Sequence, residues 1–162
     1  IGLNTRYGQV DDGMIQLRAR PENNIAPYYV DTGDFPAQSS FMAGGEVYYR
    51  RGSWLFGSEY WFQETESPET GHPIFHGGDI VATWLITGET LRFSYIDLDD
   101  KTIHGGRSWR ITPMVNWHLS DQLRLEFVYG YGTLYRSDLR GGTHFFQSRI
   151  QVTIREQDLP KN

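Results

Sequence analysis

The sequence predicts an all-β fold, and more specifically an antiparallel transmembrane β-barrel built as a meander of hairpins. Apolar and polar residues alternate with a period of two along most of the chain, and no segment of useful length has the period of a helix. Several alternating segments reach ten or more residues, beyond the roughly five or six usual in soluble strands and close to the ~9–11 of a tilted membrane-spanning strand. Short and longer connections also alternate, as they do in bacterial outer-membrane barrels.

Residues 1–154 are expected to form a barrel segment of about nine strands, and residues 155–162 a polar C-terminal tail in which the alternation is lost. The expected strands are residues 2–9, 13–20, 40–50, 54–64, 78–87, 91–98, 106–118, 122–135 and 142–154. The sequences VDDG, RRGS, TGET and LSDQ are expected to be short turns. The connections that alternate with them are expected to be longer loops, DLDDKTIHGG and RSDLRGG among them.

The composition narrows the classes of function. A chain of 162 residues is enough for one domain, and 15% aromatic residues with 18 glycines suit a β-rich chain with many turns. The absence of cysteine excludes disulfides and thiolate metal sites. The net charge of −5 does not favour nucleic-acid binding. Of the 15 basic residues 13 are Arg, the side chain best suited to binding anions or holding fixed ion pairs.

Within the predicted strands the alternation separates an apolar face from a polar face. The period alone does not show which face is inside, because a soluble barrel or sandwich hides its apolar face whereas a membrane barrel turns it toward lipid. Aromatic residues near the strand ends and the length of the strands favour the membrane barrel. The residues then expected to face lipid are Ile15, Leu17, Val47, Tyr49, Trp54, Phe56, Tyr60, Phe62, Ile80, Ala82, Trp84, Ile86, Leu91, Phe93, Tyr95, Trp109, Ile111, Val115, Leu125, Phe127, Phe146, Ile150, Val152 and Ile154.

The polar face is rich in arginine, although the whole chain is acidic. The acids on the same face, which could offset the charge of its arginines, are chiefly Glu46, Glu59, Asp79 and Glu126. Rings of Arg that line a pore favour anions such as phosphate, whereas the alternative is that each Arg pairs with an acid across neighbouring strands. The predicted pore-lining residues are Arg18, Arg20, Arg50, Arg92, Arg110, Arg124 and Arg149.

Five segments resemble the phosphate-selective porin family, O and P type, and they occur in that family's order. They are LRARPENNIAPYYVDTGDFPA, GGEVYYRRGSWLFGSEYW, GGDIVATWLITGE, LRFSYIDLDD and GGRSWRITPMVNWHLSDQLRLEFVYGY. The resemblance implies the C-terminal half of a 16-stranded outer-membrane barrel, a homotrimer or part of a larger envelope complex, that passes small anions. It also implies that the constriction loop lies in the N-terminal half, outside this chain. Two departures are a direct Glu89–Thr90 junction and the lack of a terminal aromatic residue.

No enzymatic motif accompanies these features. His72 and His76 flank Pro73 in an expected loop, so the helical geometry of a metal pair is not expected, and Glu59 with Glu126 are better interpreted as wall charges than as an acid–base pair. Neither a cofactor nor a nucleic-acid partner is expected. Two alternatives to the porin stay open. One is a soluble or surface β-sandwich that binds carbohydrate through aromatics such as Trp61 and Tyr48, and the other is a structural barrel in a larger envelope complex.

Overall fold

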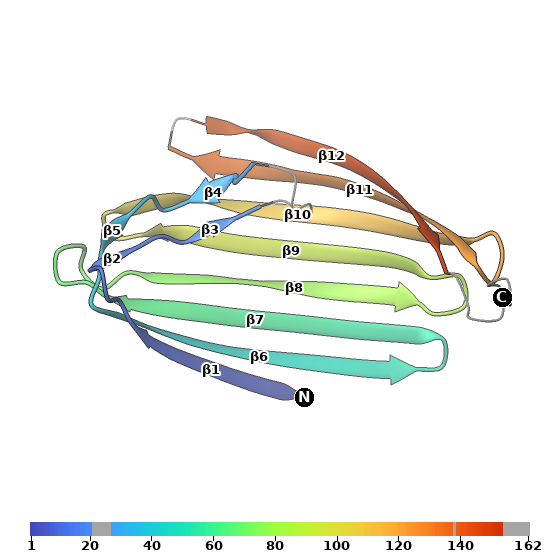
Figure 1. The fold of residues 1–162 in the computed structure, drawn as a ribbon, viewed down its shortest axis with the longest axis horizontal. Helices are drawn as coiled ribbons and strands as arrows, with labels where there is room; N and C mark the ends of the chain where they lie inside the picture. Colours follow the sequence, from blue (N-terminus) through green and yellow to red (C-terminus); the bar gives the residue numbers. More distant parts are fainter. Residues whose placement is uncertain (21–26, 138, 154–162) are drawn as a thin grey trace, which may run out of the picture.

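A computed structural model describes residues 1–20, 27–137 and 139–153, and its main element is one antiparallel sheet of eight long strands (Figure 1). The strands follow one another in chain order across the sheet, so each long strand pairs with the next long strand along the chain. They are β1 (Gly2–Gln9), β6 (Ser39–Arg51), β7 (Trp54–Glu66), β8 (Ile74–Trp84), β9 (Glu89–Asp100), β10 (Ile103–His118), β11 (Leu123–Arg136) and β12 (Leu139–Val152). The predicted all-β antiparallel meander is therefore confirmed.

The short turns lie together at one end of the sheet, on the right of Figure 1. They join β6 to β7, β8 to β9 and β10 to β11. Gly52 and Gly88 in two of these turns have φ angles of 58° and 82°, a left-handed conformation that glycine adopts without steric cost. The turn before β9 is short, as the direct Glu89–Thr90 junction predicts.

At the opposite end, two connections are shorter than the sequence predicts. Strands β9 and β10 pair until only Lys101 and Thr102 remain between them, and β11 and β12 are bounded by Arg136 and Leu139. The expected loops DLDDKTIHGG and RSDLRGG are therefore mostly strand, so that part of the prediction is wrong. Their polar residues continue the ladder of backbone hydrogen bonds, because strand pairing does not require apolar side chains.

The expected wall strand at residues 13–20 is also absent from the large sheet. Residues 10–20 and 27–38 instead form an inward-folded segment that crosses one face of the sheet and packs against residues of β8, β9 and β10 (Figure 1). Within it β2 (Met14–Ile15) pairs with β5 (Phe35–Pro36), and β3 (Arg18–Ala19) pairs with β4 (Val30–Asp31). The prediction of nine wall strands therefore becomes eight among the described residues, while the predicted tail at 155–162 lies outside them.

The inward-folded segment covers the main buried core of the described residues. Val30 and Phe35 of the segment pack against Phe75, Leu98 and Ile103 of the sheet. The rings of Phe35 and Phe75 meet edge-on with centroids 6.0 Å apart. Ile15 and Leu17, which the alternation assigns to the lipid-facing set, join this core from inside, so their prediction is wrong. Their alternation is real, but the apolar surface they meet is the inner wall.

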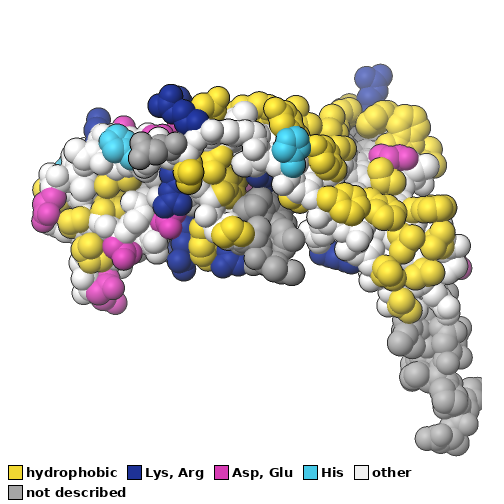
Figure 2. All heavy atoms as spheres, turned by 90° about the horizontal axis from the view of Figure 1, so that it is seen from above, with side chains coloured by type: hydrophobic (Ala, Val, Ile, Leu, Met, Phe, Trp, Pro, Cys, Tyr) yellow, Lys and Arg dark blue, Asp and Glu magenta, His cyan; other side chains and the backbone are white. Residues whose placement is uncertain are grey.

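The opposite face of the sheet is apolar and uncovered. Trp54, Tyr60, Ile80, Trp117 and Phe146 are between 39% and 67% exposed, and no second sheet covers this face in the described part of the chain. Figure 2 shows hydrophobic side chains gathered along the upper edge and right-hand part of the sheet, and several Lys and Arg on the lower side. A sandwich would bury this apolar face, so the structure contradicts the sandwich alternative.

The sheet is open, because β1 and β12 each pair on one edge only. Among the described residues no helix is long and apolar enough to cross a membrane.

Candidate functional site

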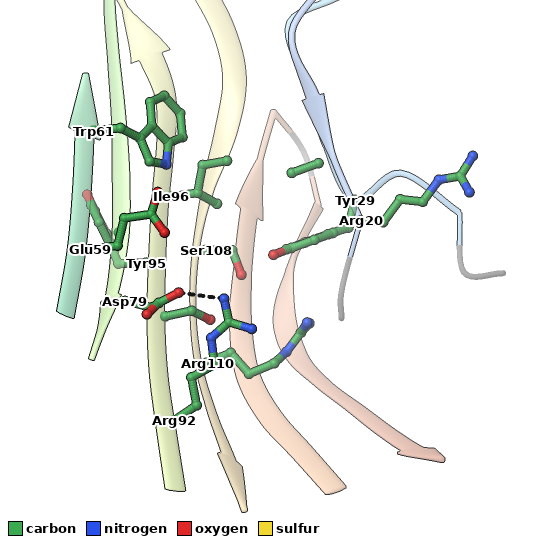
Figure 3. A pocket seen from close by; sticks show the side chains of 13 residues that line it. Arg20, Tyr29, Glu59, Trp61, Asp79, Arg92, Tyr95, Ile96, Ser108 and Arg110 are labelled. Atoms are coloured by element: carbon green, nitrogen blue, oxygen red, sulfur yellow. Dashed lines mark hydrogen bonds and ion pairs between the residues drawn. The ribbon is translucent and has the colours of Figure 1, made fainter. Parts of the chain in front are cut away.

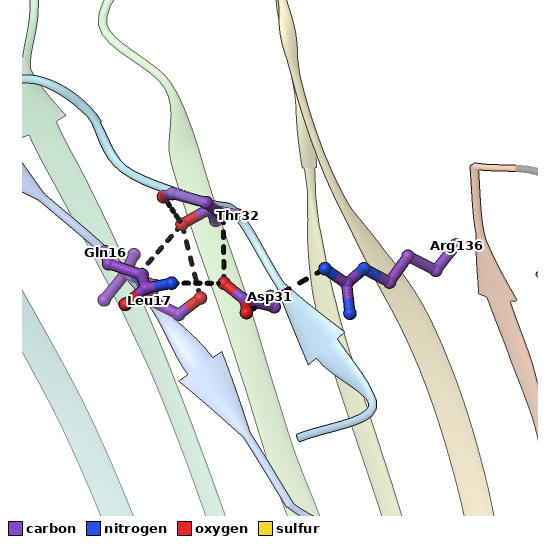
Figure 4. Close-up of polar contacts among 6 residues, drawn as sticks. Gln16, Leu17, Asp31, Thr32 and Arg136 are labelled. Atoms are coloured by element: carbon purple, nitrogen blue, oxygen red, sulfur yellow. Dashed lines mark hydrogen bonds and ion pairs between the residues drawn. The ribbon is translucent and has the colours of Figure 1, made fainter. Parts of the chain in front are cut away.

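A set of polar contacts fixes the inward-folded segment to itself and to the sheet (Figure 4). The side chain of Gln16 donates to an Asp31 carboxylate oxygen at 2.9 Å, and Arg136 of β11 lies 3.8 Å from the other oxygen. The backbone N–H of Leu17 donates to the Thr32 hydroxyl oxygen at 2.9 Å, and the Thr32 backbone N–H donates to the Leu17 carbonyl at 2.9 Å. Together with the apolar core, these bonds hold the segment at a defined distance from the wall.

The two arginines of this segment share one aromatic ring. The guanidinium carbons of Arg18 and Arg20 lie 4.2 Å and 4.1 Å from the centroid of Tyr28, within the range of cation–π attraction. Leu17 and Ala19 pack against the core, so the alternation turns both arginines away from it. Both side chains are exposed on the inner side of the sheet.

Arg110 is the most enclosed of the predicted pore-lining arginines, with 3% of its surface exposed. Its guanidinium carbon lies 5.0 Å from the centroid of Tyr29 and 5.1 Å from that of Phe145. One terminal nitrogen is 3.4 Å from the Thr143 hydroxyl, and Nε has no hydrogen-bond partner among the described residues. An enclosed cation with an unmade hydrogen bond is costly unless an anion or water completes it.

Arg110 lies at a cavity of about 270 Å³ between the inward-folded segment and the wall (Figure 3). Arg20 and Tyr29 line it from the segment, and Arg92 and Asp79 line it from β9 and β8. Asp79 accepts a hydrogen bond from Arg92 at 2.5 Å. Glu59 of β7 is a second acid in the lining. The cavity is therefore polar and of mixed charge, with room for a small anion and several water molecules.

The remaining predicted pore-lining residues lie elsewhere on the inner face. Arg124 and Arg149 are each 3.9 Å from Glu126, and Arg124 also donates to Gln151 at 2.6 Å. Arg50 donates to the Gly52 carbonyl at 3.4 Å, beside a short turn. The structure thus groups Arg18, Arg20, Arg92 and Arg110 around the inward-folded segment and places the other three closer to the short-turn end.

The alternation missed the aromatic members of the site. Tyr28, Tyr29 and Phe145 hold the arginines, but none was singled out from the sequence. Nor did the sequence predict that residues 10–20 and 27–38 fold inward onto the wall. The pair of adjacent tyrosines after Pro27, flanked by the two arginines and Asp31, was the available signal.

The residues considered for other chemistry do not converge. His72 lies in the connection between β7 and β8, whereas the ring of His76 lies on the outer face between Tyr60 and Tyr95, with centroids 5.9 Å and 5.7 Å away. No group of three or more potential metal ligands forms among the described residues. Glu59 and Glu126 stand on β7 and β11, with three strands between them.

Comparison of the chain with known proteins identifies its family. The model of the family described as phosphate-selective porin O and P matches residues 4–154. An uncharacterized protein of Caulobacter vibrioides is 22% identical over 151 residues, which cover 75% of this chain and 31% of that protein. The chain thus spans less than a third of that relative's length. No solved structure matches the chain. The match over almost the whole chain shows that the protein belongs to the phosphate-selective porin O and P family, a family of channels and not of enzymes.

Proposed function

We propose that this chain is part of an outer-membrane porin that passes small anions, phosphate among them, through a water-filled pore lined by inward-facing arginines. The observation that carries the proposal is Arg110, an enclosed cation whose Nε is unsatisfied beside a cavity. The pore-lining set is the one predicted from the alternation, and the grouping of Arg18, Arg20 and Arg92 with Arg110 around one segment supports it.

The outer face supports a position in lipid. On the outer face, Trp84 and His76 of β8, and Trp117 and Trp109 of β10, mark the ends of an apolar stretch, and the residues of each pair are eight positions apart in the sequence. At ~3.3 Å per residue this stretch is about 26 Å long along the strand, and strand tilt makes its height across the membrane smaller. Outer-membrane barrels carry an apolar band of about 25 Å between aromatic girdles. The membrane partner of this face is therefore outer-membrane lipid.

The open sheet supports a larger barrel. Within lipid the unpaired N–H and C=O groups along the outer edges of β1 and β12 would each cost several kcal/mol. Other polypeptide must therefore pair with both edges. We propose that the remaining strands come from a longer polypeptide of which this chain is one part, as the length of the Caulobacter relative suggests, and that the complete barrels associate as trimers.

Conductance of the complete polypeptide in planar bilayers tests the proposal. The reversal potential in a salt gradient is expected to show anion preference, because three arginines and two acids line the cavity beside the inward-folded segment. Replacing Arg18 and Arg20 together by Gln is expected to lower the ratio of anion to cation permeability several-fold.

The control is Arg51→Gln, which removes one positive charge from the outward face beside Trp54 at a short turn. That variant is expected to keep the selectivity of the wild type. A preference of the wild-type channel for cations would contradict the proposal, and so would equal effects of the two substitutions.

A further inference from the structure

A second basic pocket lies on the outer side of the sheet, away from the proposed pore. It has a volume of about 260 Å³ and lies beside the β9–β10 and β11–β12 hairpins, towards the left of Figure 1. Its lining residues include Asp99, His104, Arg107, Tyr135, Arg136 and Arg140. Three of them are arginines and one is an acid, so positive charge predominates in the lining, although Arg136 also lies 3.8 Å from Asp31 of the inward-folded segment.

The strand register shows which way these arginines point. Arg107 of β10 is the partner of Tyr135 on β11, and Tyr135 is the partner of Arg140 on β12. Directly paired residues share a face, so all three lie on one face of the sheet. Trp109 lies two residues from Arg107 and therefore on the same face, which is the apolar outer face. Arg107 also lies over the Tyr135 ring, 5.6 Å from its centroid.

Two described acids near this pocket, Asp99 and Asp97, the second of which is the strand partner of Arg107, already accept hydrogen bonds from other groups. Asp99 accepts one from the backbone N–H of Gly106 at 2.7 Å. Asp97 accepts one from the Tyr95 hydroxyl at 2.8 Å and one from the backbone N–H of Asp99 at 2.9 Å. Neither Arg107 nor Arg140 forms an ion pair with a carboxylate of the described residues. Two exposed guanidinium groups are thus available to a ligand.

The position of the pocket identifies the ligand class. Arg107 lies two residues beyond Trp109, about 7 Å along the strand, and Trp109 marks one end of the apolar band. Aromatic residues at the ends of such a band sit at headgroup level. A cation one step further out, on the same outer face, meets the phosphate groups of the lipid rather than its chains or the pore.

We propose that this pocket binds a phosphate group of a membrane lipid headgroup between the guanidinium groups of Arg107 and Arg140. Guanidinium donates paired hydrogen bonds to phosphate oxygens, and Tyr135 between the two arginines supplies an amphipathic surface for the adjoining part of the lipid. The site differs from the proposed anion path, because the arginines of that path lie on the inner face. It requires membrane insertion of the barrel, but not anion selectivity.

The test is lipid binding by the complete polypeptide in a non-ionic detergent, measured by native mass spectrometry. The probe is dioctanoyl phosphatidic acid, and dioctanoyl glycerol is the matched lipid without phosphate. The wild type is expected to bind the first and not the second. Arg107→Gln together with Arg140→Gln is expected to weaken binding at least tenfold, because two charge-assisted hydrogen-bonding groups are removed.

Arg51→Gln is the control, since it removes an outward-facing arginine at the other end of the sheet, and it is expected to bind as the wild type does. Unchanged binding by the double variant, or an equal loss in the control, would overturn the proposal. If inorganic phosphate at equal concentration displaces the probe completely, the ligand is free phosphate and the lipid assignment fails. If the double variant has the same conductance and selectivity as the wild type, its barrel is intact. If the wild-type channel prefers cations but still binds the lipid, the proposed anion path is refuted and the lipid site is not.

Discussion

At the scale of single residues, the inner face combines cations held by aromatic rings with cations held by acids. Arg110 lies between Tyr29 and Phe145, and among the described residues it forms no ion pair. Arg92 is instead paired with Asp79 at 2.5 Å. A ring lowers the cost of enclosing a guanidinium without cancelling its charge, whereas a carboxylate cancels it. Residues that look equivalent in the sequence alternation therefore contribute differently to the potential inside the pore.

Asp79→Asn tests this difference. The substitution keeps the shape of the side chain and removes the negative charge beside Arg92, so the cavity becomes more positive by one charge. We expect a higher ratio of anion to cation permeability in the complete channel, measured from reversal potentials at low ionic strength, where screening is weakest.

The control for Asp79→Asn is Glu89→Gln, which removes an exposed acid at a short turn, at the far end of β8 and β9 from the cavity. It is expected to leave the selectivity as it is. Lower anion selectivity in Asp79→Asn would mean that Asp79 holds Arg92 in a working position and does not neutralise it.

At the scale of elements, the inward-folded segment is fixed by a small apolar core. Phe35 is 3% exposed and meets Phe75 edge-on. Replacing a buried Phe by Ala costs ~3–5 kcal/mol, and the core that holds the segment is small. We therefore expect Phe35→Ala to release the inward-folded segment from the wall, with larger single-channel conductance and faster proteolysis in this segment.

Phe41→Ala serves as the comparison for Phe35→Ala. Phe41 is 39% exposed on the outer face of β6, so its loss leaves the inward-folded segment in contact with its core. Unchanged conductance and protease resistance are expected of it. If Phe35→Ala behaves in the same way, the polar contacts of Asp31 and Thr32 hold the segment without the apolar core.

The same segment shows what the sequence alone could predict at this scale. Ile154, which was predicted to face lipid, lies outside the described residues. All eight long strands correspond to segments that alternation interrupted by turn residues predicts, whereas a ninth predicted strand was wrongly assigned to the wall. That strand, residues 13–20, alternates as the others do, because Ile15 and Leu17 meet an apolar surface on one side only. Alternation records that one side is apolar, but it does not record whether lipid or the inner wall provides it. The arginine-rich face was predictable because it follows from alternation within single strands. The contacts of Tyr28 and Tyr29 with arginines were not predictable, because they form only when the inward-folded segment folds on itself and packs onto the sheet.

At the scale of the whole molecule, the sheet has an apolar outer face, proposed to meet lipid, and an inner face proposed to line the pore. Ile80 stands midway between Trp84 and His76 on the outer face and is 59% exposed. Val81, its neighbour in the chain, faces the inner side beside Gly57 and Tyr48. Both residues are apolar and β-branched, and they lie on opposite faces of the sheet. Substituting each by Arg therefore separates the lipid face from the pore face.

We expect Ile80→Arg to impair assembly of the complete barrel, because an arginine near the middle of the lipid face of an outer-membrane barrel costs ~2–4 kcal/mol. Val81→Arg is expected to assemble, since its side chain reaches a water-filled lumen, and to raise anion selectivity. Heat-modifiable mobility on electrophoresis of outer-membrane fractions measures assembly. Normal assembly of Ile80→Arg with failure of Val81→Arg would mean that the apolar face points inward and that the two sides of the sheet have been assigned the wrong way round.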